Sequence, residues 1–244
     1  MISVIAPMLN EEKHIMDFLE SLEKQSYFNF ELILIDGGSS DRSRILVDYF
    51  NNSFPITAVI NEKRNLGYIR NYGSKLARGE ILLFTNSDAV FPRFFLDKIA
   101  ARFQDPDLGA LSGPTVPLEA GPVTELAYFC FDYLRWLFSK RGKFSPSGNF
   151  LAIHRDLFLT ANGFPEVPIN EDGLLGQRIS WILKTFCGYA LFDFDIAAAH
   201  YIKKGRKGIK TLMFYAYVFG NFSGFLRWLL DPIMRKSSRE FNKK

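Results

Sequence analysis

The sequence predicts an α/β fold in which a mostly parallel central sheet is flanked by helices, followed by an amphipathic helical tail at the C-terminus. Short β-branched and aliphatic runs alternate with segments of helical period through the first half of the chain. Apolar residues make up 48% of the chain and charged residues 23%, as is typical of globular domains. The length of 244 residues suits one such domain with a modest appendage.

Strands and helices are expected to alternate strictly in the first third of the chain. The expected strands are Ile2–Met8, Glu31–Ile35, Ile56–Ile60 and Ile81–Phe84, and the helices between them are Glu11–Lys24, Asp41–Asn51 and Tyr68–Ala77. Such alternation indicates parallel pairing. Ligands of parallel sheets bind beyond the carboxyl ends of the strands, so we look for function in the residues that follow each strand.

The alternation loosens after Pro92. The expected helices are Phe94–Phe103, Val123–Phe138, Asp156–Ala161 and one from Glu171 to about Phe186. Strands are expected at Leu108–Gly113 and Phe150–His154, with two further short strands ending at His200. Residues 113–122, between the first of these strands and the helix that begins at Val123, are rich in Pro and Gly.

The charge of the chain is unevenly distributed. The whole chain carries +4, but residues 203–244 carry +9, which leaves −5 for the rest. This basic segment also contains the aromatic and aliphatic block Leu212–Phe219. The pattern predicts an anionic partner surface, either phospholipid headgroups or nucleic acid, and a solvated helix face is the alternative. A continuous apolar block does not suit a nucleic-acid groove, so we expect no nucleic acid as partner.

Cysteine usage and apolar run lengths predict a cytoplasmic protein. Two cysteines, Cys130 and Cys187, give no disulfide framework, and their aromatic surroundings predict that both are buried. The strand-like first residues lack the basic region and cleavage site of a signal peptide, so we expect none. The uncharged apolar stretch at residues 211–226 has 16 residues, fewer than the ~20 of a spanning helix, so we expect an interfacial segment and no transmembrane span.

Polar residues follow three of the expected strands and could line one cleft. Asn10 and Glu11 follow the first strand, and Asp36 ends the second, before a Gly-Gly-Ser-Ser turn. The Asp36 carboxylate could accept from a nucleobase or a ribose hydroxyl; the alternative is a strand–helix turn capped by Ser39 or Ser40. A glycine cradle for phosphates is absent, which shifts the neutralisation of a diphosphate to a metal.

Asn86, Ser87 and Asp88 follow the fourth strand and are a candidate metal site. Asp88 could hold Mg²⁺ or Mn²⁺ bridging the two phosphates of a nucleoside diphosphate, with the metal as Lewis acid. An Asx-turn is the alternative. His200 could be a further metal ligand or a donor to the diphosphate, and a structural histidine is the alternative.

Glu171 and Asp172 open an expected helix. A carboxylate at a helix start could act as general base toward an acceptor hydroxyl. Acidic residues in a first turn are also favoured by the helix dipole alone, which is the alternative.

Eight short motifs occur in an order that closely resembles family-two glycosyltransferases of the GT-A fold. The resemblance spans roughly residues 2–200. The motifs are Ile5–Glu12, Ile35–Asp41, Asn65–Gly67 with Arg70–Gly73, Ala77–Ile81, Asn86–Asp88, Gly148–Ile153, Asn162–Glu166 and Glu171–Asp172.

The resemblance implies transfer of a sugar from a UDP-, GDP- or dTDP-sugar, with inversion at the anomeric carbon. The implied metal ligand is Asp88 and the implied catalytic base is Asp172, and His200 is expected as a further metal ligand from its position in the sequence. Asn149 and Glu171 would lie on the acceptor side. The residues implied for the nucleotide sugar are Pro7, Asn10, Glu11, Asp36, Arg70, Asn86 and Ser87. Two positions depart from the pattern: Asn86 replaces the first aspartate of the family's D-x-D motif, and Pro165 replaces an aspartate near the acceptor.

We expect a GT-A domain at residues 1–202, with a nucleotide-binding half (1–92) and an acceptor half (93–202). The tail, residues 203–244, resembles the membrane-associating extension of members that act on lipid carriers, so we expect a lipid-linked acceptor at the cytoplasmic face of a membrane. The helix Val123–Phe138 adds an apolar stripe that is either membrane-facing or core: Leu126, Phe129, Tyr133 and Leu137. The alternatives are a soluble saccharide or protein acceptor, and a non-catalytic module that binds nucleotide sugars.

Overall fold

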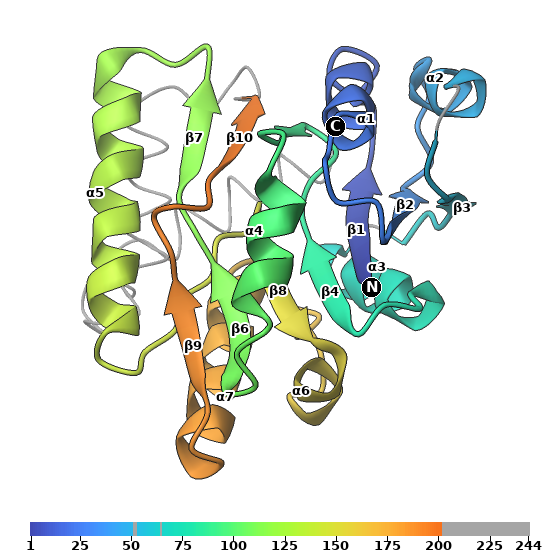
Figure 1. Cartoon of the computed structure of the whole chain (residues 1–244). Coiled ribbons are helices and arrows are strands. Elements are labelled where there is room, and N and C mark those ends of the chain that lie inside the picture. Colours follow the sequence, from blue (N-terminus) through green and yellow to red (C-terminus); the bar gives the residue numbers. More distant parts are fainter. Residues whose placement is uncertain (51–52, 64, 202–244) are drawn as a thin grey trace.

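The computed structural model describes residues 1–50, 53–63 and 65–201 (Figure 1). Its main feature is a seven-stranded sheet in the order β3-β2-β1-β4-β8-β6-β9. These strands are β1 (Ile2–Met8), β2 (Phe30–Asp36), β3 (Ile56–Ile60), β4 (Ile81–Phe84), β6 (Leu108–Ser112), β8 (Leu151–His154) and β9 (Tyr189–Phe192). The expected tail, residues 203–244, lies outside the described residues.

The pairing of the strands confirms a mostly parallel sheet. β1 to β4 pair in parallel, and β6 pairs with β9 in parallel. β8 is the exception, because it runs antiparallel between β4 and β6. The start of β8, at Leu151, therefore lies beside Phe84 at the end of β4.

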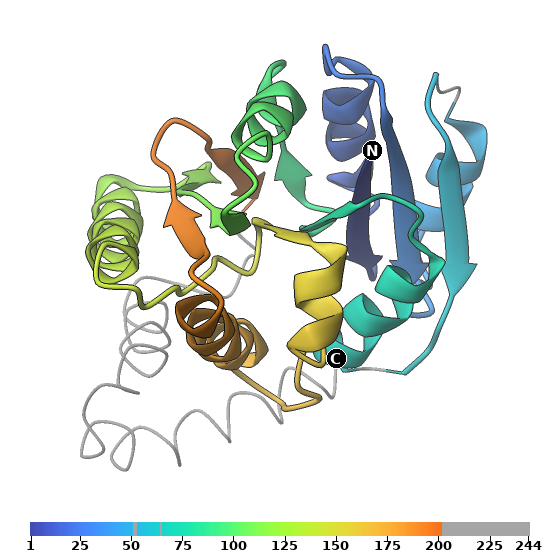
Figure 2. The ribbon, with the colours of Figure 1, turned by 60° about the horizontal axis from the view of Figure 1, so that its bottom comes forward.

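Helices cover both faces of this sheet, as Figure 2 shows. One layer contains α1 (Ile15–Glu23), α2 (Ser43–Tyr49) and α4 (Phe95–Arg102), and the other contains α3 (Leu66–Leu76), α6 (Arg155–Thr160) and α7 (Glu171–Thr185). Alternating side chains of a strand point to opposite faces. In β1, Val4 packs in the cluster under α1 and α4, and Ile5 packs in the cluster under α3 and α7.

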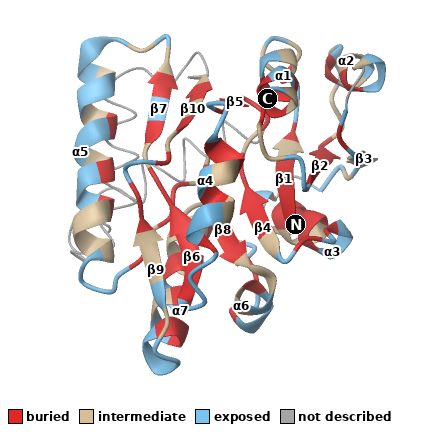
Figure 3. Cartoon of the chain, in the orientation of Figure 1, coloured by how far each residue is buried: buried red, intermediate tan, exposed pale blue. Residues whose placement is uncertain are grey.

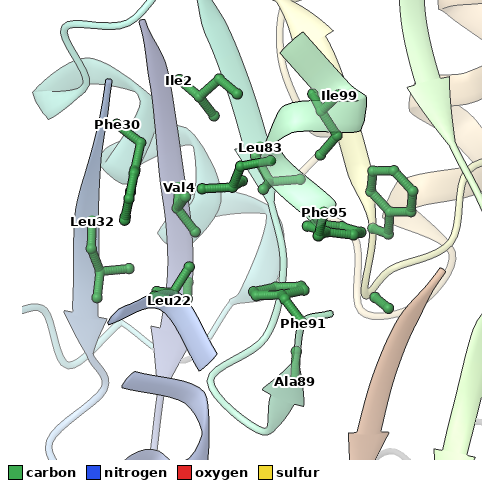
Figure 4. Packing of buried hydrophobic residues seen from close by; sticks show 14 of the residues in the cluster. Ile2, Val4, Leu22, Phe30, Leu32, Leu83, Ala89, Phe91, Phe95 and Ile99 are labelled. Atoms are coloured by element: carbon green, nitrogen blue, oxygen red, sulfur yellow. The ribbon is translucent and has the colours of Figure 1, made fainter. Parts of the chain in front are cut away.

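The first of these two clusters extends from the nucleotide-binding half expected from the sequence into the other half. Figure 4 shows Val4, Phe30 and Leu83 of the sheet beside Leu22 of α1 and Phe95 of α4. Apolar side chains that interdigitate across this boundary stabilise the two halves together. They therefore form parts of one packed body.

A smaller three-stranded sheet, in the order β5-β10-β7, lies beside the main one. Its strands are β5 (Ala89–Val90), β7 (Thr115–Leu118) and β10 (Ala198–Tyr201), and α5 (Pro122–Ser139) packs against β7. Two of these strands have no counterpart in the sequence prediction. β5 has only two residues, and β7 contains Pro117, which is tolerated because β7 is an edge strand.

Two helices begin later than the sequence predicts. α1 starts at Ile15 instead of Glu11, because Asn10 has a left-handed backbone with φ 55° and a turn follows it. α2 starts at Ser43 instead of Asp41, because the Asp41 carboxylate accepts from the Ser43 backbone N–H, 3.0 Å away. Ser39 and Ser40 therefore do not cap α2, and that alternative for the turn after Asp36 is wrong.

Helix α5 exposes its apolar stripe along the side of the molecule (Figure 3). Leu126 and Phe129 are 62% and 61% exposed, and Tyr133 is exposed as well, so a core role for these three side chains is wrong. Cys130 on the same helix and Cys187 are also exposed, against the expectation that both are buried. Within the described residues no helix combines the length and the apolar character needed to cross a membrane.

Candidate functional site

The site residues gather where β1, β2 and β4 end and β8 begins. Parallel strands bring their carboxyl ends to one edge, and the antiparallel β8 brings its first residues to the same edge. Asn86, which follows β4, therefore lies beside Asn149, which precedes β8. The Asn86 Nδ2 donates to Asn149 Oδ1, and the Thr85 hydroxyl donates to the Asn149 carbonyl at 3.0 Å.

Arg70 of α3 stands at the centre of the site with a side chain only 1% exposed. Its Nη1 donates to Asp172 Oδ1 at 2.8 Å and to Glu171 Oε1 at 3.2 Å. Its Nη2 donates to the Gly148 carbonyl at 2.7 Å and to Asn86 Oδ1 at 3.4 Å. One guanidinium therefore joins the first turn of α7, the loop before β8 and the segment after β4.

The two carboxyl groups at the start of α7 have different surroundings. The side chain of Asp172 is 21% exposed and that of Glu171 is 10% exposed. Burial raises the pKa of Glu171 to about 7, helped by the adjacent Asp172 carboxylate and opposed by the Arg70 guanidinium. Burial thus favours the protonated form of Glu171, and the more exposed Asp172 is the better placed of the two to meet an acceptor.

Gly148 leaves space for the side chain of Asp172. A Cβ at Gly148 would lie 2.6 Å from Asp172 Oδ2 and 3.7 Å from Arg70 Nη2. A side chain at this position would displace the carboxylate, because real Cβ atoms do not approach other atoms so closely. In the sequence this residue stands out only as the first residue of the motif Gly148–Ile153, which says nothing of the contact with Asp172.

Asp88 is the residue best suited to hold a cation. It is 5% exposed, and its Oδ1 has no hydrogen-bond donor among the described residues. An acceptor buried without a donor is costly, and a bound cation removes that cost. Among the residues that the structure describes, no three or more His, Cys, Asp or Glu side chains form a group that could hold a metal ion. The described residues therefore offer Asp88 as one ligand of a cation and not a complete ligand set.

His200 reaches this region through the pairing of β10 with β5. It lies opposite Ala89, and the Tyr201 backbone N–H donates to the Asp88 carbonyl at 3.1 Å. Its Nδ1 lies 3.2 Å from the Tyr201 carbonyl, and its ring lies 5.4 Å from that of Tyr128. The structure thus brings His200 next to the strand that begins after Asp88, although the two are far apart in sequence.

A second polar cluster joins the loops after β1 and β2. Asp36 Oδ1 accepts from the Ser39 backbone N–H at 2.9 Å and from its hydroxyl at 2.7 Å. The Asn10 N–H donates to Ser39 Oγ at 3.0 Å, and Asn10 Oδ1 accepts from the Ser40 N–H at 2.9 Å. Asn10 and Asp36 are thus brought together as the sequence predicts. The linking role of Ser39 was not predicted.

The remaining candidates lie between these clusters. Glu11 is buried, and its backbone N–H donates to Ser43 Oγ at 2.7 Å. The Ser87 hydroxyl donates to the Pro7 carbonyl at 2.8 Å, which ties the segment after β4 to the end of β1. Arg70 contacts candidates of both expected groups, because it donates to the carboxyl groups of Glu171 and Asp172 and also to Asn86.

Comparison with known proteins assigns the chain to a family. Residues 3–159 match the family model described as "Glycosyl transferase family 2". The chain belongs to glycosyl transferase family 2. The matched range covers β1 to α6 and includes every candidate residue named above except Glu171, Asp172 and His200.

Curated proteins similar to the chain include two bacterial glycosyltransferases. Glycosyltransferase GlyG of Streptococcus pneumoniae is 29% identical over 115 residues, which are 46% of this chain and 38% of GlyG. The poly(ribitol-phosphate) β-N-acetylglucosaminyltransferase TarS of Staphylococcus aureus is 35% identical over 107 residues, 42% of this chain and 18% of TarS. The chain thus matches less than two fifths of the length of each.

Two solved structures share the fold over 90% of the chain. Mannosyltransferase PcManGT of Pyrobaculum calidifontis, in complex with GDP-Man and Mn²⁺, superposes with a TM-score of 0.71 at 22% identity, over 90% of this chain and 63% of that one. S. aureus TarS 1–349 in complex with UDP-GlcNAc gives 0.68 at 22% identity, over 90% and 66%. The expected GT-A fold is confirmed.

Proposed function

We propose that this protein transfers a sugar from a nucleoside-diphosphate sugar to a hydroxyl group of a lipid-linked acceptor, with inversion at the anomeric carbon. The observation that carries the proposal is the arrangement around Arg70. A carboxylate, Asp172, is held at one side of the edge where the strands end, and the segment that carries Asp88 lies at the other. A base and a cation ligand so placed suit a displacement between them.

The donor would lie over the carboxyl ends of β1, β2 and β4. Asp36 and Asn10 would contact the nucleobase and the ribose, with Glu11 nearby. Pro7 and Ser87 would lie between the ribose and the phosphates. Family members of known structure bind GDP-Man and UDP-GlcNAc. These ligands support a UDP-, GDP- or dTDP-sugar as the donor class.

Asp88, with His200 beside it, would hold a divalent metal, Mg²⁺ or Mn²⁺. Such an ion supplies Lewis-acid stabilisation of the leaving nucleoside diphosphate when bound. The buried Oδ1 of Asp88, which has no hydrogen-bond donor among the described residues, fits the role of a metal ligand. The Mn²⁺ in the PcManGT complex also supports a divalent metal. Asn86 would contribute a neutral amide oxygen, so we expect weaker metal binding than with two aspartates.

Asp172 would act as the general base. The acceptor oxygen attacks the anomeric carbon while the bond to the diphosphate oxygen breaks, and the electron pair leaves with the nucleoside diphosphate. The acceptor proton passes to the Asp172 carboxylate, whose Oδ2 lies beside Gly148. A single displacement of this kind inverts the configuration. Asn149 and Glu171 would border the acceptor.

The outer face of α5 supports an acceptor at a membrane surface. The exposed side chains Leu126, Phe129 and Tyr133 form an apolar stripe, and Lys140, Arg141 and Lys143 follow at its end, all exposed. Apolar side chains with basic residues at their edge suit the headgroup layer of an anionic bilayer. The role of residues 203–244 and the cytoplasmic side of the membrane stay predictions.

A nucleoside-diphosphate release assay tests the proposal and names the donor. The full chain is incubated with lipid extract and UDP-, GDP- or dTDP-sugars, with and without Mn²⁺ or Mg²⁺. We expect release with one nucleotide class, dependent on metal and reduced at least about 100-fold in Asp88→Ala. Asp97→Ala, a change at an acidic residue in the first turn of α4, is the control.

Asn86 also favours a second candidate, a non-catalytic module that binds nucleotide sugars. A neutral residue at this position lowers the charge available to a metal. That candidate predicts nucleotide binding by calorimetry without release from any donor, which would contradict the transferase proposal.

A further inference from the structure

We propose that Arg70 is a positioning residue for the base Asp172 and does not contact the nucleotide. The inference rests on the proposed function, because it assigns the group that orients the base of that reaction. It departs from the role implied by the sequence motif, in which Arg70 holds the nucleotide. The observations that carry it are the burial of Arg70 and the identity of its four acceptors.

The guanidinium of Arg70 is enclosed by protein. The side chain is 1% exposed, and the ring of Phe164 lies 5.2 Å from its central carbon. Both terminal nitrogens already donate to protein oxygens in three separate segments. A nucleotide could reach this group only by displacing those contacts. The geometry favours a fixed internal cation.

The contacts of Arg70 determine which oxygen of Asp172 is left for the acceptor. Nη1 holds Oδ1 at 2.8 Å, while Oδ2 lies on the side of Gly148. The carboxylate is thereby fixed between the guanidinium and the loop before β8. A base fixed in this way needs no reorientation when the acceptor arrives, and a misplacement of about 1 Å can cost about 100-fold in rate.

The single positive charge of Arg70 pairs with two carboxyl groups. Glu171 Oε1 lies 3.2 Å from the same Nη1 that holds Asp172. Only an arginine can offer several N–H groups in a fixed plane to Glu171, Asp172, Asn86 and the Gly148 carbonyl together, whereas a lysine is a single point charge. The substitution Arg70→Lys therefore keeps the charge and removes the geometry.

Binding and turnover measured separately in Arg70→Lys and Arg70→Gln test this role. For both variants we expect the calorimetric Kd of the nucleoside diphosphate to stay within about twofold of the wild type, while kcat falls about 100-fold. In Arg70→Gln the acidic limb of the pH–rate profile should move to higher pH, because the carboxyl pair of Glu171 and Asp172 loses its positive charge. Gly148→Ala should reproduce the loss of kcat with unchanged Kd, because its Cβ displaces Asp172 from the opposite side.

Arg155→Lys is the matched control. Arg155 also donates to the backbone, at 2.7 Å and 2.9 Å to the Gly79 carbonyl, but at the other end of β8. We expect the Arg155→Lys variant to keep the kcat of the wild type, while its thermal stability falls about as far as that of Arg70→Lys. A tenfold or larger rise in nucleotide Kd with kcat retained in Arg70→Lys would overturn the inference. Failure of the wild type to release nucleotide would instead contradict the proposed function.

Discussion

At the scale of single residues, the site combines two carboxyl groups that are adjacent in sequence and differ in how far they are buried. Glu171 is buried, and its pKa is raised from 4.5 to about 7 by burial and by Asp172. A carboxyl group whose pKa is raised on folding stabilises the fold fully below its unfolded pKa. That contribution is lost as the pH rises toward the folded pKa. Glu171 thus favours folding at acidic pH and opposes it above neutral pH.

The substitution Glu171→Gln tests this assignment. Glutamine resembles the neutral carboxyl group, so the variant should be more stable than the wild type at pH 8 by roughly 1–3 kcal/mol and nearly equal to it at pH 5. Urea unfolding at both pH values measures the difference. Glu125→Gln, at an exposed acid in the first turn of α5, should show no such pH dependence. An equal difference at both pH values would show that Glu171 is ionised throughout.

Sequence patterns predicted which residues lie together at the site better than they predicted the individual contacts of those residues. Asp36 and Asn10 could be predicted as neighbours, because both follow parallel strands. Three of the four partners of Arg70 could not be predicted, since they come from a loop and a helix more than 70 residues away. The space that Gly148 leaves for Asp172 depends on the insertion of β8 between two other strands, which no local pattern encodes.

At the scale of elements, helix α5 has two faces with different roles. Its inner face is polar where it meets the small sheet: Asp132 accepts from the Thr115 N–H at 3.0 Å and from Arg135 at 2.9 Å. Burial raises the pKa of Asp132, partly offset by Arg135. The Thr115 hydroxyl in turn lies 2.8 Å from that of Ser147, next to Gly148. The inner face therefore fixes α5 relative to the site, and the apolar outer face stays exposed.

We expect the outer face of α5 to bind anionic bilayers. The triple substitution Leu126→Ser, Phe129→Ser, Tyr133→Ser should weaken binding of the full chain to phosphatidylcholine–phosphatidylglycerol vesicles at least about tenfold, because it removes the apolar area available for burial. Sedimentation with vesicles measures this. Tyr49→Ser changes an aromatic residue of α2 that is 84% exposed and should leave binding unchanged. Equal binding by the triple variant and the wild type would exclude α5 as the contact.

Most elements could be predicted from hydrophobic period, because long buried runs such as β2 have few alternatives. The two missed strands, β5 and β7, are short edge or near-edge pieces whose pairing partner, β10, lies about 80 residues or more further along the chain. The orientation of α5 was left open for a related reason. An amphipathic pattern shows that a helix has an apolar stripe and does not show whether protein covers it.

At the scale of the whole molecule, one packed body carries the site along a single sheet edge. Three parallel strands, β1, β2 and β4, position the expected nucleotide contacts, and the antiparallel β8 with α7 positions the residues expected on the acceptor side. Arg70 connects the two parts. The proposed reaction therefore depends on Asp172 acting as the base where the nucleotide-binding residues and the acceptor side meet.

The most direct test compares wild type and Asp172→Asn in release of nucleoside diphosphate from the donor, with lipid-linked acceptor and metal present. Asparagine keeps the shape of the side chain and cannot take the acceptor proton, so we predict a loss of kcat of at least about 100-fold with donor binding retained. Asp156→Asn, at an acidic residue in the first turn of α6, should keep the wild-type rate. A wild-type rate in Asp172→Asn would contradict the account.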